Sequence, residues 1–436
     1  MTHLEHLPET ARARRFTLLM RVITAAVLIA AGTGIVAVPS YAVVPSPMPH
    51  PSTSPSPMPH PSTSPSPMPL PSTSPSPTPT SAPILPQAPK VLFRDDFESI
   101  LNAAVKLLNQ YRGAMPISMS YTANPFWLNE ANCNGMVQSA IGHDGILCAL
   151  NAESKLLAKV LGVVNHSADP STNRVVAELT ASTAGAANLV ELQTARTIPV
   201  GAKNRFVTAS INVASENCAR VGSTSRDAQL QLSLADGANI GALFSTPINP
   251  CTAKNTKTAV KGVYAGTFTG DTALLVVGNT VGVTLRNGTG SFLGNDHAFD
   301  DLTILDATPQ LTTSFMPSTV PLGRSSRLSY RITNTAELAA KGGFSWSNAL
   351  PAGISVAAVP LFSSTCAAVS AAPVAGATAV SFTASLARDT ASCVVSVNVV
   401  TASAGAFTND ASRMTLIGLN PAPTAVLTVT APPRPF

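Results

Sequence analysis

SRLSYRITNT, at residues 326–335, decides the fold, because apolar and polar side chains alternate over the full length of a strand. Leu328, Tyr330 and Ile332 fall on one face of an extended chain, and this period of two is typical of a half-buried β-strand. The same alternation recurs in AVSFTASL (379–386) and CVVSVNVV (393–400). The pattern therefore predicts a β-sandwich over residues 308–430.

Three further motifs in this region carry a resemblance to a known family. They are LGRSSRLSYRITNT (322–335), NALPAGISV (348–356) and AGAFTNDAS (404–412). With them the region resembles the bacterial DUF11-type conserved repeat. The resemblance implies an Ig-like sandwich that serves as a rigid spacer or adhesive module and has no known active site. Residues 431–436 follow as a tail.

The preceding region, residues 91–307, also has the pattern of an all-β domain. Its strand signals are RFVTASINVA (205–214), AQLQLSL (228–234), TALLVVG (272–278), VGVTLRN (281–287) and FDDLTIL (299–305). Short alternating runs separated by Gly, Asn, Asp and Ser are typical of a sandwich or barrel. Two segments, 99–112 and 151–164, instead space apolar residues as a surface helix does. We expect a helix at 151–164, and 99–112 is the weaker candidate.

The two ends of this region resemble the terminal strands of a jelly roll. LFRDDFES (92–99) and GNDHAFDDLTILD (294–306) are similar to the first and last strands of carbohydrate-binding and galactose-binding-like modules. That resemblance implies a jelly-roll-like sandwich whose terminal strands lie side by side. With YTANPFWL (121–128) and NCNG (132–135), the chain resembles an exported bacterial surface protein in which an Ig-like repeat follows this domain. No activity is implied.

The N-terminus has the features of an export signal. A basic stretch precedes an uncharged apolar run at residues 22–38, and small residues follow, so we expect a cleaved signal peptide over 1–42. An uncleaved membrane anchor is the alternative, and membrane contact is expected only in that form. Residues 43–90 repeat the unit PSPMPHPSTS, and so much proline excludes helix and sheet. This segment is predicted to be a disordered, polyproline-II-like stalk, and the protein to be secreted or cell-surface.

The cysteines fit an exported protein, because their even number favours disulfides and their wide spacing argues against zinc. They are Cys133, Cys148, Cys218, Cys251, Cys366 and Cys393. A Cys366–Cys393 bridge is predicted in the last domain, since no other cysteine is near. Among the other four, sequential pairing gives the shortest loops, but three connectivities stay open.

Carboxylates at the two terminal strands form a candidate metal site. Phe93, Asp95 and Phe97 share one face of an extended strand, and Leu302 brings Asp300 to the inner face of the last strand. Two inward carboxylates on neighbouring strands repel each other, so they need a cation or hydrogen-bond donors. A structural Ca²⁺ would meet that need through oxygen ligands. The candidate ligands are Asp95, Asp96, Glu98 and Asp300.

Composition and motifs favour a protein that is not an enzyme. Only 11% of the 436 residues are charged and the formal net charge is +5, which excludes a nucleic-acid protein built on a dense basic surface. No metal-hydrolase, nucleophile-elbow or P-loop motif is present. Tyr121, Phe126 and Trp127 are the candidates for stacking on a sugar ring, although a lone Trp is more often core.

Three hypotheses for function follow from this sequence. The first is an exported or cell-surface protein with an adhesive or architectural role and a surface-protein partner. The second is a carbohydrate-binding protein that recognises wall or extracellular polysaccharide. The third, a polysaccharide-active hydrolase, has the least support.

Overall fold

The computed structural model describes residues 85–100, 104–141, 152–179, 186–216, 218, 227–253, 257–260, 262–290 and 296–432. The predicted signal peptide and nearly all of the predicted stalk lie outside these residues. Within them the chain is strands apart from one α-helix and short 3₁₀ turns. The prediction of an all-β sandwich fold is confirmed.

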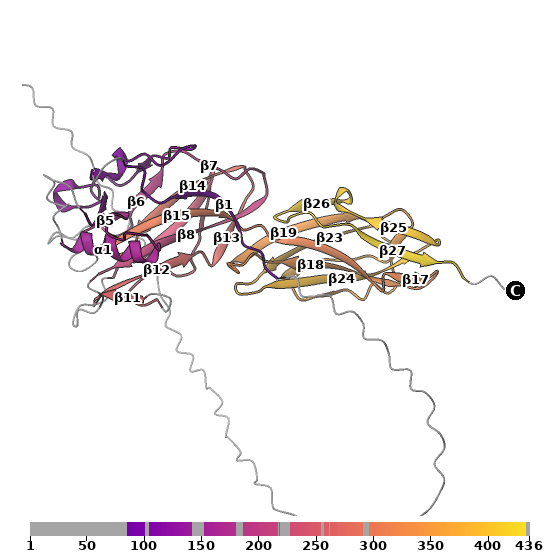
Figure 1. Cartoon of the computed structure of the whole chain (residues 1–436). Coiled ribbons are helices and arrows are strands. Elements are labelled where there is room, and N and C mark those ends of the chain that lie inside the picture. The colour runs from indigo at the N-terminus through magenta and orange to yellow at the C-terminus, as the bar shows by residue number, and fades with distance from the viewer. Residues whose placement is uncertain are drawn as a thin grey trace, which may run out of the picture. The chain divides into compact units, whose positions relative to one another are not determined.

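The first sandwich has one sheet in which the ends of the region meet (Figure 1). The order is β2–β4–β5–β15–β8–β13, with β1 also on β15 and β12 also on β8. These strands are β1 (Lys90–Asp95), β2 (Lys106–Leu107), β4 (Met136–Ser139), β5 (Arg174–Glu178), β8 (Arg205–Ser215), β11 (Lys257–Val260, on β12), β12 (Val263–Thr269), β13 (Thr272–Val276) and β15 (His297–Asp306). β1 pairs antiparallel with β15, so the expectation of adjacent terminal strands is correct.

The second sheet of this sandwich has the order β10–β9–β14–β6–β3, and β7 also pairs with β14. Its strands are β3 (Tyr121–Thr122), β6 (Leu189–Thr194), β7 (Ile198–Pro199), β9 (Leu230–Asp236), β10 (Asn239–Ala242) and β14 (Thr280–Asn287). Alternate residues of the two sheets form one core; Val213 and Phe299 come from the first sheet and Leu232 and Leu285 from the second. All four are fully buried or nearly so.

Helix α1 (Ala152–Val164) forms as its sequence predicts. Its apolar stripe, including Leu157 and Leu161, packs on Val175 and Ala214 of the first sheet, on the face opposite the main core. The weaker prediction of a helix at 99–112 is wrong for the described part of that segment. Residues 106–107 form β2, and only a 3₁₀ turn, η1 (Leu108–Gln110), follows. Burial of Leu108 and Tyr111 in the main core favours this irregular path over the helical pattern.

The second sandwich packs two sheets and a small third one around an aromatic core. The first sheet has the order β16–β18–β24–β20, and β21 also pairs with β24. In the second sheet β19 pairs with β23 and β26, and β22 pairs with β23. The small third sheet has the order β17–β27–β25. The strands are β16 (Gln310–Met316), β17 (Thr319–Pro321), β18 (Ser326–Thr333), β19 (Ala340–Ala349), β20 (Ile354–Val356), β21 (Ser363–Ser364), β22 (Ala367–Ser370), β23 (Ala379–Leu386), β24 (Ser392–Thr401), β25 (Gly405–Asn409), β26 (Met414–Ile417) and β27 (Ala425–Thr430). Tyr330, Trp346 and Phe382 meet at its centre, with ring centroids 5.0–5.5 Å apart.

A short parallel ladder joins the strands of the two sandwiches. Thr272 and Ala273 of β13 pair with Ala340 and Lys341 of β19. The ladder is only two residue pairs long, but it makes one continuous sheet out of strands from both cores.

Candidate functional site

The predicted sugar-stacking residues do not form a surface platform. Tyr121 and Trp127 are 2% and 3% exposed and belong to the core of the first sandwich, whereas Phe126 is 88% exposed. The Trp127 indole N–H donates to Glu178 Oε2 at 2.8 Å, and the Tyr121 hydroxyl donates to Asp95. Polar partners inside the core thus hold both rings there, and a sugar ring cannot reach them.

Asp95 is buried as the sequence predicts, and protein donors occupy its oxygens. Oδ1 accepts from the Tyr111 hydroxyl at 2.6 Å and from the Phe97 backbone N–H at 3.0 Å. Oδ2 accepts from the Tyr121 hydroxyl at 2.6 Å. Burial raises the pKa of the Asp95 carboxyl, and these hydrogen bonds oppose that rise. Burial and the neighbouring carboxylate raise the pKa of both tyrosines, so they stay donors.

Asp300 is buried on the other face of the sheet, which corrects the expectation that it lies beside Asp95. A β-bulge between Asp300 and Thr303 breaks the alternation on β15. Phe299 and Leu302 therefore both face the main core, and Asp300 faces the end of α1. There it accepts hydrogen bonds from Asn165 and Asn173 at 2.6 and 2.8 Å, and burial raises its pKa well above the usual range.

The other two predicted metal ligands have separate partners as well. Asp96 caps the backbone N–H of Glu98 at 3.2 Å, and Glu98 forms an ion pair with Arg174 at 2.9 Å. Because Asp95 and Asp300 face opposite sides of the sheet, the four carboxylates are not one ligand set. Calcium binding stays a prediction.

The disulfides follow the predicted pairing where the structure describes both cysteines. Cys218 is bonded to Cys251, and Cys366 to Cys393. Cys133 is disulfide-bonded too, while Cys148 lies outside the described residues. No cysteine in the described part of the chain is free.

A buried cluster that the sequence analysis missed lies between the two sheets of the first sandwich. Glu178 on β5 and His297 on β15 are paired across neighbouring strands, and Glu191 reaches them from β6 in the facing sheet. His297 Nε2 is 2.9 Å from Glu191 Oε2 and 3.6 Å from Glu178 Oε2. All three residues are at most 4% exposed. No motif spacing signals the cluster, since its members come from three distant strands.

This cluster is the one group in the described residues whose His and carboxylate atoms converge closely enough to hold a metal ion. One ligand atom from each residue lies within 4.8 Å of the others. A neutral imidazole and two carboxylates suit zinc or manganese, and a dication would balance their charge. Protons bound to the carboxylates can balance this negative charge as well. Burial and the nearby Glu191 raise the pKa of Glu178 to about 8, which favours a shared proton.

A second buried polar cluster occupies the turn between β18 and β19 in the second sandwich. The Lys341 side chain is fully buried, and its ammonium donates to Glu337 Oε1 at 2.7 Å, to the Ala339 carbonyl at 3.2 Å and to Asn334 Oδ1. Asn334 is 1% exposed. Burial of a lysine is costly, and here a carboxylate, a carboxamide and a carbonyl oxygen all accept hydrogen bonds from its ammonium.

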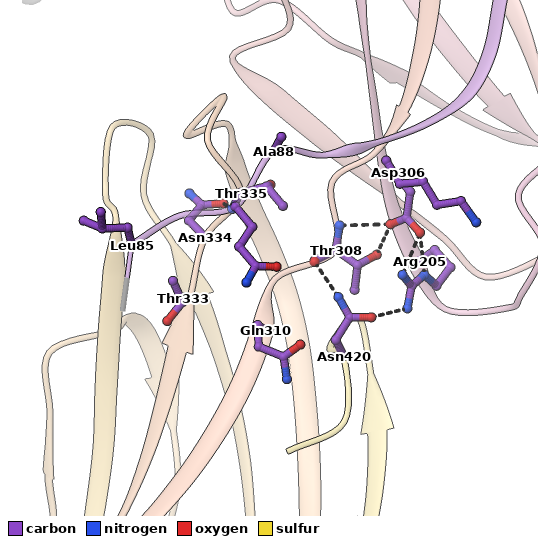
Figure 2. A pocket seen from close by; sticks show the side chains of 12 residues that line it. Leu85, Ala88, Arg205, Asp306, Thr308, Gln310, Thr333, Asn334, Thr335 and Asn420 are labelled. Atoms are coloured by element: carbon purple, nitrogen blue, oxygen red, sulfur yellow. Dashed lines mark hydrogen bonds and ion pairs between the residues drawn. The ribbon is translucent and has the colours of Figure 1, made fainter. Parts of the chain in front are cut away.

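A pocket of about 210 Å³ lies where β15 ends and β16 begins; Figure 2 shows the residues that line it. Four residues there form a closed ring of hydrogen bonds, in which Thr308 takes part through its hydroxyl and its backbone carbonyl. Arg205 donates to Asp306 Oδ2 at 2.6 and 3.0 Å and to Asn420 Oδ1 at 2.7 Å. Asn420 donates to the Thr308 carbonyl at 2.9 Å, and the Thr308 hydroxyl donates to Asp306 at 2.6 Å. The ring ties β8 and β15 of the first sandwich to the chain just before β27 of the second.

Comparison with known proteins finds a family model that matches the second sandwich. Residues 309–429 match the model of a domain of unknown function, DUF7933, from just before β16 to the penultimate residue of β27. Among solved structures, the chain is similar to the N-terminal domain of the Streptococcus gordonii adhesin Sgo0707, with 9% identity over 76% of this chain and 82% of that chain. The TM-score of 0.25 is too low to establish a shared fold. No curated protein matches the chain.

Proposed function

We propose that the chain is an exported surface protein that has an architectural or adhesive role and is not an enzyme. The observation that carries the proposal is the way in which two disulfide-bonded sandwiches are joined. The β13–β19 ladder and the Arg205–Asp306–Thr308–Asn420 ring link the two cores with directional contacts. A loose tether between independent modules would need none of them.

Disulfides support the exported part of the proposal, because they persist in oxidising compartments outside the cytosol. Among the described residues, no helix has both the length and the apolar character needed to cross a membrane. Attachment through an uncleaved signal segment therefore stays a separate prediction.

Location is tested by protease treatment of intact cells that produce the full chain. Export predicts digestion by external protease, together with thiols that resist alkylation until the protein is reduced. Protection from protease in intact cells, with alkylatable cysteines, would refute export. Adhesion is then tested by comparing surface attachment of cells with and without the gene.

Joining of the sandwiches is tested by hydrogen exchange on the full chain. We expect slow exchange of the Gly418 N–H, which donates to the Asn204 carbonyl at 3.0 Å, and of the Ala340 N–H, which donates to the Asp271 backbone carbonyl at 2.8 Å. Arg205→Ala should speed exchange at Gly418. Arg324→Ala, at an exposed turn, is the control and should leave it unchanged. Fast exchange at both sites in the unmodified protein would argue for a loose tether.

Carbohydrate binding stays the second candidate, and of the three predicted stacking residues Phe126 alone is exposed. A glycan array with the full chain and with Phe126→Ala tests it. Binding that the substitution abolishes would favour this function over a purely architectural one.

A further inference from the structure

We propose that Lys341 and Asn334 form an intramolecular isopeptide bond and that Glu337 transfers the proton for the reaction. The proposal goes beyond the proposed function, because the bond can form whatever the protein does at the surface. Asn334 directly follows β18, and Lys341 is the second residue of β19. These strands belong to different sheets, so the bond would join the two sheets of the second sandwich covalently.

The reacting groups are in contact and shielded from water. The Lys341 ammonium donates to Asn334 Oδ1, and the side chains of Lys341 and Glu337 are 0% and 4% exposed. Held in this way, the amine and the carboxamide have a very high effective concentration. Lys341 pairs in the ladder with Ala273 and with Leu386 on its other side, so β19 fixes the position of its backbone.

The carboxamide is oriented with its oxygen toward the amine. Asn334 Oδ1 also accepts the backbone N–H of Thr335 at 2.9 Å. Its Nδ2 donates to the carbonyls of Thr390 at 2.9 Å and Ala339 at 3.3 Å, which fixes the assignment of oxygen and nitrogen. The Thr335 N–H is therefore placed to stabilise the negative charge that develops on Oδ1 when the carbon is attacked.

The surroundings also favour a reactive amine. Desolvation lowers the pKa of Lys341, although Glu337 opposes the shift. Glu337 Oε1 accepts from Lys341 and from the Thr335 hydroxyl at 2.5 Å, while its buried Oε2 has no hydrogen-bond partner in the described structure. A buried carboxylate oxygen without a donor is costly, and it is a site at which a proton can be carried.

The reaction needs no oxidant or other reactant. Glu337 first takes a proton from the ammonium, and the neutral Nζ attacks Cγ of Asn334 as the π electrons move to Oδ1. Glu337 then gives this proton to Nδ2 and takes a second one from Nζ. The electrons on Oδ1 re-form the C=O bond as the Cγ–Nδ2 bond breaks and ammonia leaves, so a secondary amide between the two side chains remains and Glu337 holds the proton that the ammonia takes up as it departs. Asn334 also lines the pocket of Figure 2, whose rim includes the exposed Leu85, so ammonia has a route to solvent.

Peptide mass spectrometry of the reduced and alkylated full-length protein tests the bond. Trypsin cleaves after Arg331, and it would cleave after Lys341 only if that side chain is free. The next basic residue is Arg388. We expect one peptide spanning 332–388, lighter by one ammonia than its sequence requires, with fragment ions that connect Asn334 and Lys341. Complete cleavage to an unmodified 332–341 peptide would overturn the proposal.

Variants separate the chemistry from a merely structural role. Glu337→Gln keeps the shape of the side chain but cannot carry the proton in this way, so the free 332–341 peptide should appear. Lys341→Met and Asn334→Ala each should give a full-length mass with no ammonia lost. Glu98→Gln, which removes an exposed ion pair in the first sandwich, is the control and should leave the bond complete. Bond formation at the unmodified level in Glu337→Gln would exclude the role assigned to Glu337.

Discussion

Replacing Tyr121 by Phe should destabilise the first sandwich more than the same change at Tyr111, although both hydroxyls donate to Asp95 at 2.6 Å. The two variants differ in the hydrogen bonds that remain on the Asp95 oxygens. Without the Tyr111 hydroxyl, Oδ1 still accepts the Phe97 N–H. Without the Tyr121 hydroxyl, Oδ2 loses its hydrogen bond. Gly113 packs so closely on Oδ2 that a Cβ there would lie 2.5 Å away, which leaves little room for water.

The expected magnitude follows from the cost of a lost hydrogen bond to a charged group, about 1.5–3 kcal/mol. We place Tyr111→Phe at the low end, about 1.5 kcal/mol, and Tyr121→Phe at about 3 kcal/mol, because the latter leaves an unsatisfied oxygen. For a domain of this size these values correspond to falls in Tm of about 3–6 °C and 6–12 °C.

The cost of Tyr121→Phe should also depend on pH. Burial raises the pKa of Asp95 in the folded protein, so the folded state holds this proton more tightly than the unfolded state. Stability from this group therefore falls as pH rises through the folded pKa. The variant penalises the ionised carboxylate in particular. Its cost should be smaller at pH 4, where more of Asp95 is protonated, than at pH 7.

Urea unfolding followed by tryptophan fluorescence measures these effects. Trp127 and Trp346 each lie in the core of one sandwich, and the buried indole nitrogen of Trp346 has no hydrogen-bond partner in the described structure. Trp346→Phe is therefore a suitable background in which Trp127 reports on the first sandwich alone. Tyr264→Phe on β12 is the control. Equal costs for the two tyrosines, or a cost of Tyr121→Phe that does not change with pH, would refute the reasoning.

Three more predictions concern the disulfide, the buried acid cluster and the junction. Cys366→Ser with Cys393→Ser opens a loop with a sequence separation of 27, and the chain-entropy model gives a loss of about 3.5 kcal/mol, measurable as a lower unfolding midpoint in the Trp346 signal. Raising the pH from 6 to 9 should destabilise the first sandwich, because the pKa of Glu178 is raised to about 8 and its ionisation is therefore linked to unfolding; Glu178→Gln should flatten that dependence in calorimetry. Arg205→Ala removes three partly buried hydrogen bonds and should cost about 2 kcal/mol, and a midpoint within error of the unmodified protein would contradict the assigned ring.

The positions of many strands, and the two disulfides for which the structure describes both cysteines, could be predicted from the sequence. Both kinds of prediction depend on local pattern. The alternation in residues 326–333 and 379–386 gives β18 and β23, and an isolated cysteine pair gives Cys366–Cys393. The orientation of Asp300 could not be predicted, since one bulge on β15 reverses the face that strict alternation assigns to it.

Buried polar contacts were the other feature that local pattern did not reveal. Trp127 finds its acceptor on Glu178, 51 residues later, and His297 finds Glu191, 106 residues earlier. Tertiary structure alone brings such residues together. An aromatic run such as Tyr121–Trp127 has the same sequence pattern whether its polar ends point to solvent or into a core.

Because β1 pairs with β15, the first sheet of the first sandwich cannot be completed until β15 has been synthesised. Lys90 lies opposite Asp306, and β15 is also the strand between β5 and β8. At about 5–20 residues per second, synthesis delivers β15 about 10–40 s after β1. Until then the sheet lacks its middle strand and β1 has no partner in it. An unpaired strand edge can pair with other chains, so we expect the first sandwich to be most prone to aggregation during that interval. In the second sandwich the longest wait is about half as long, because β17 pairs with β27, which follows it after just over 100 residues.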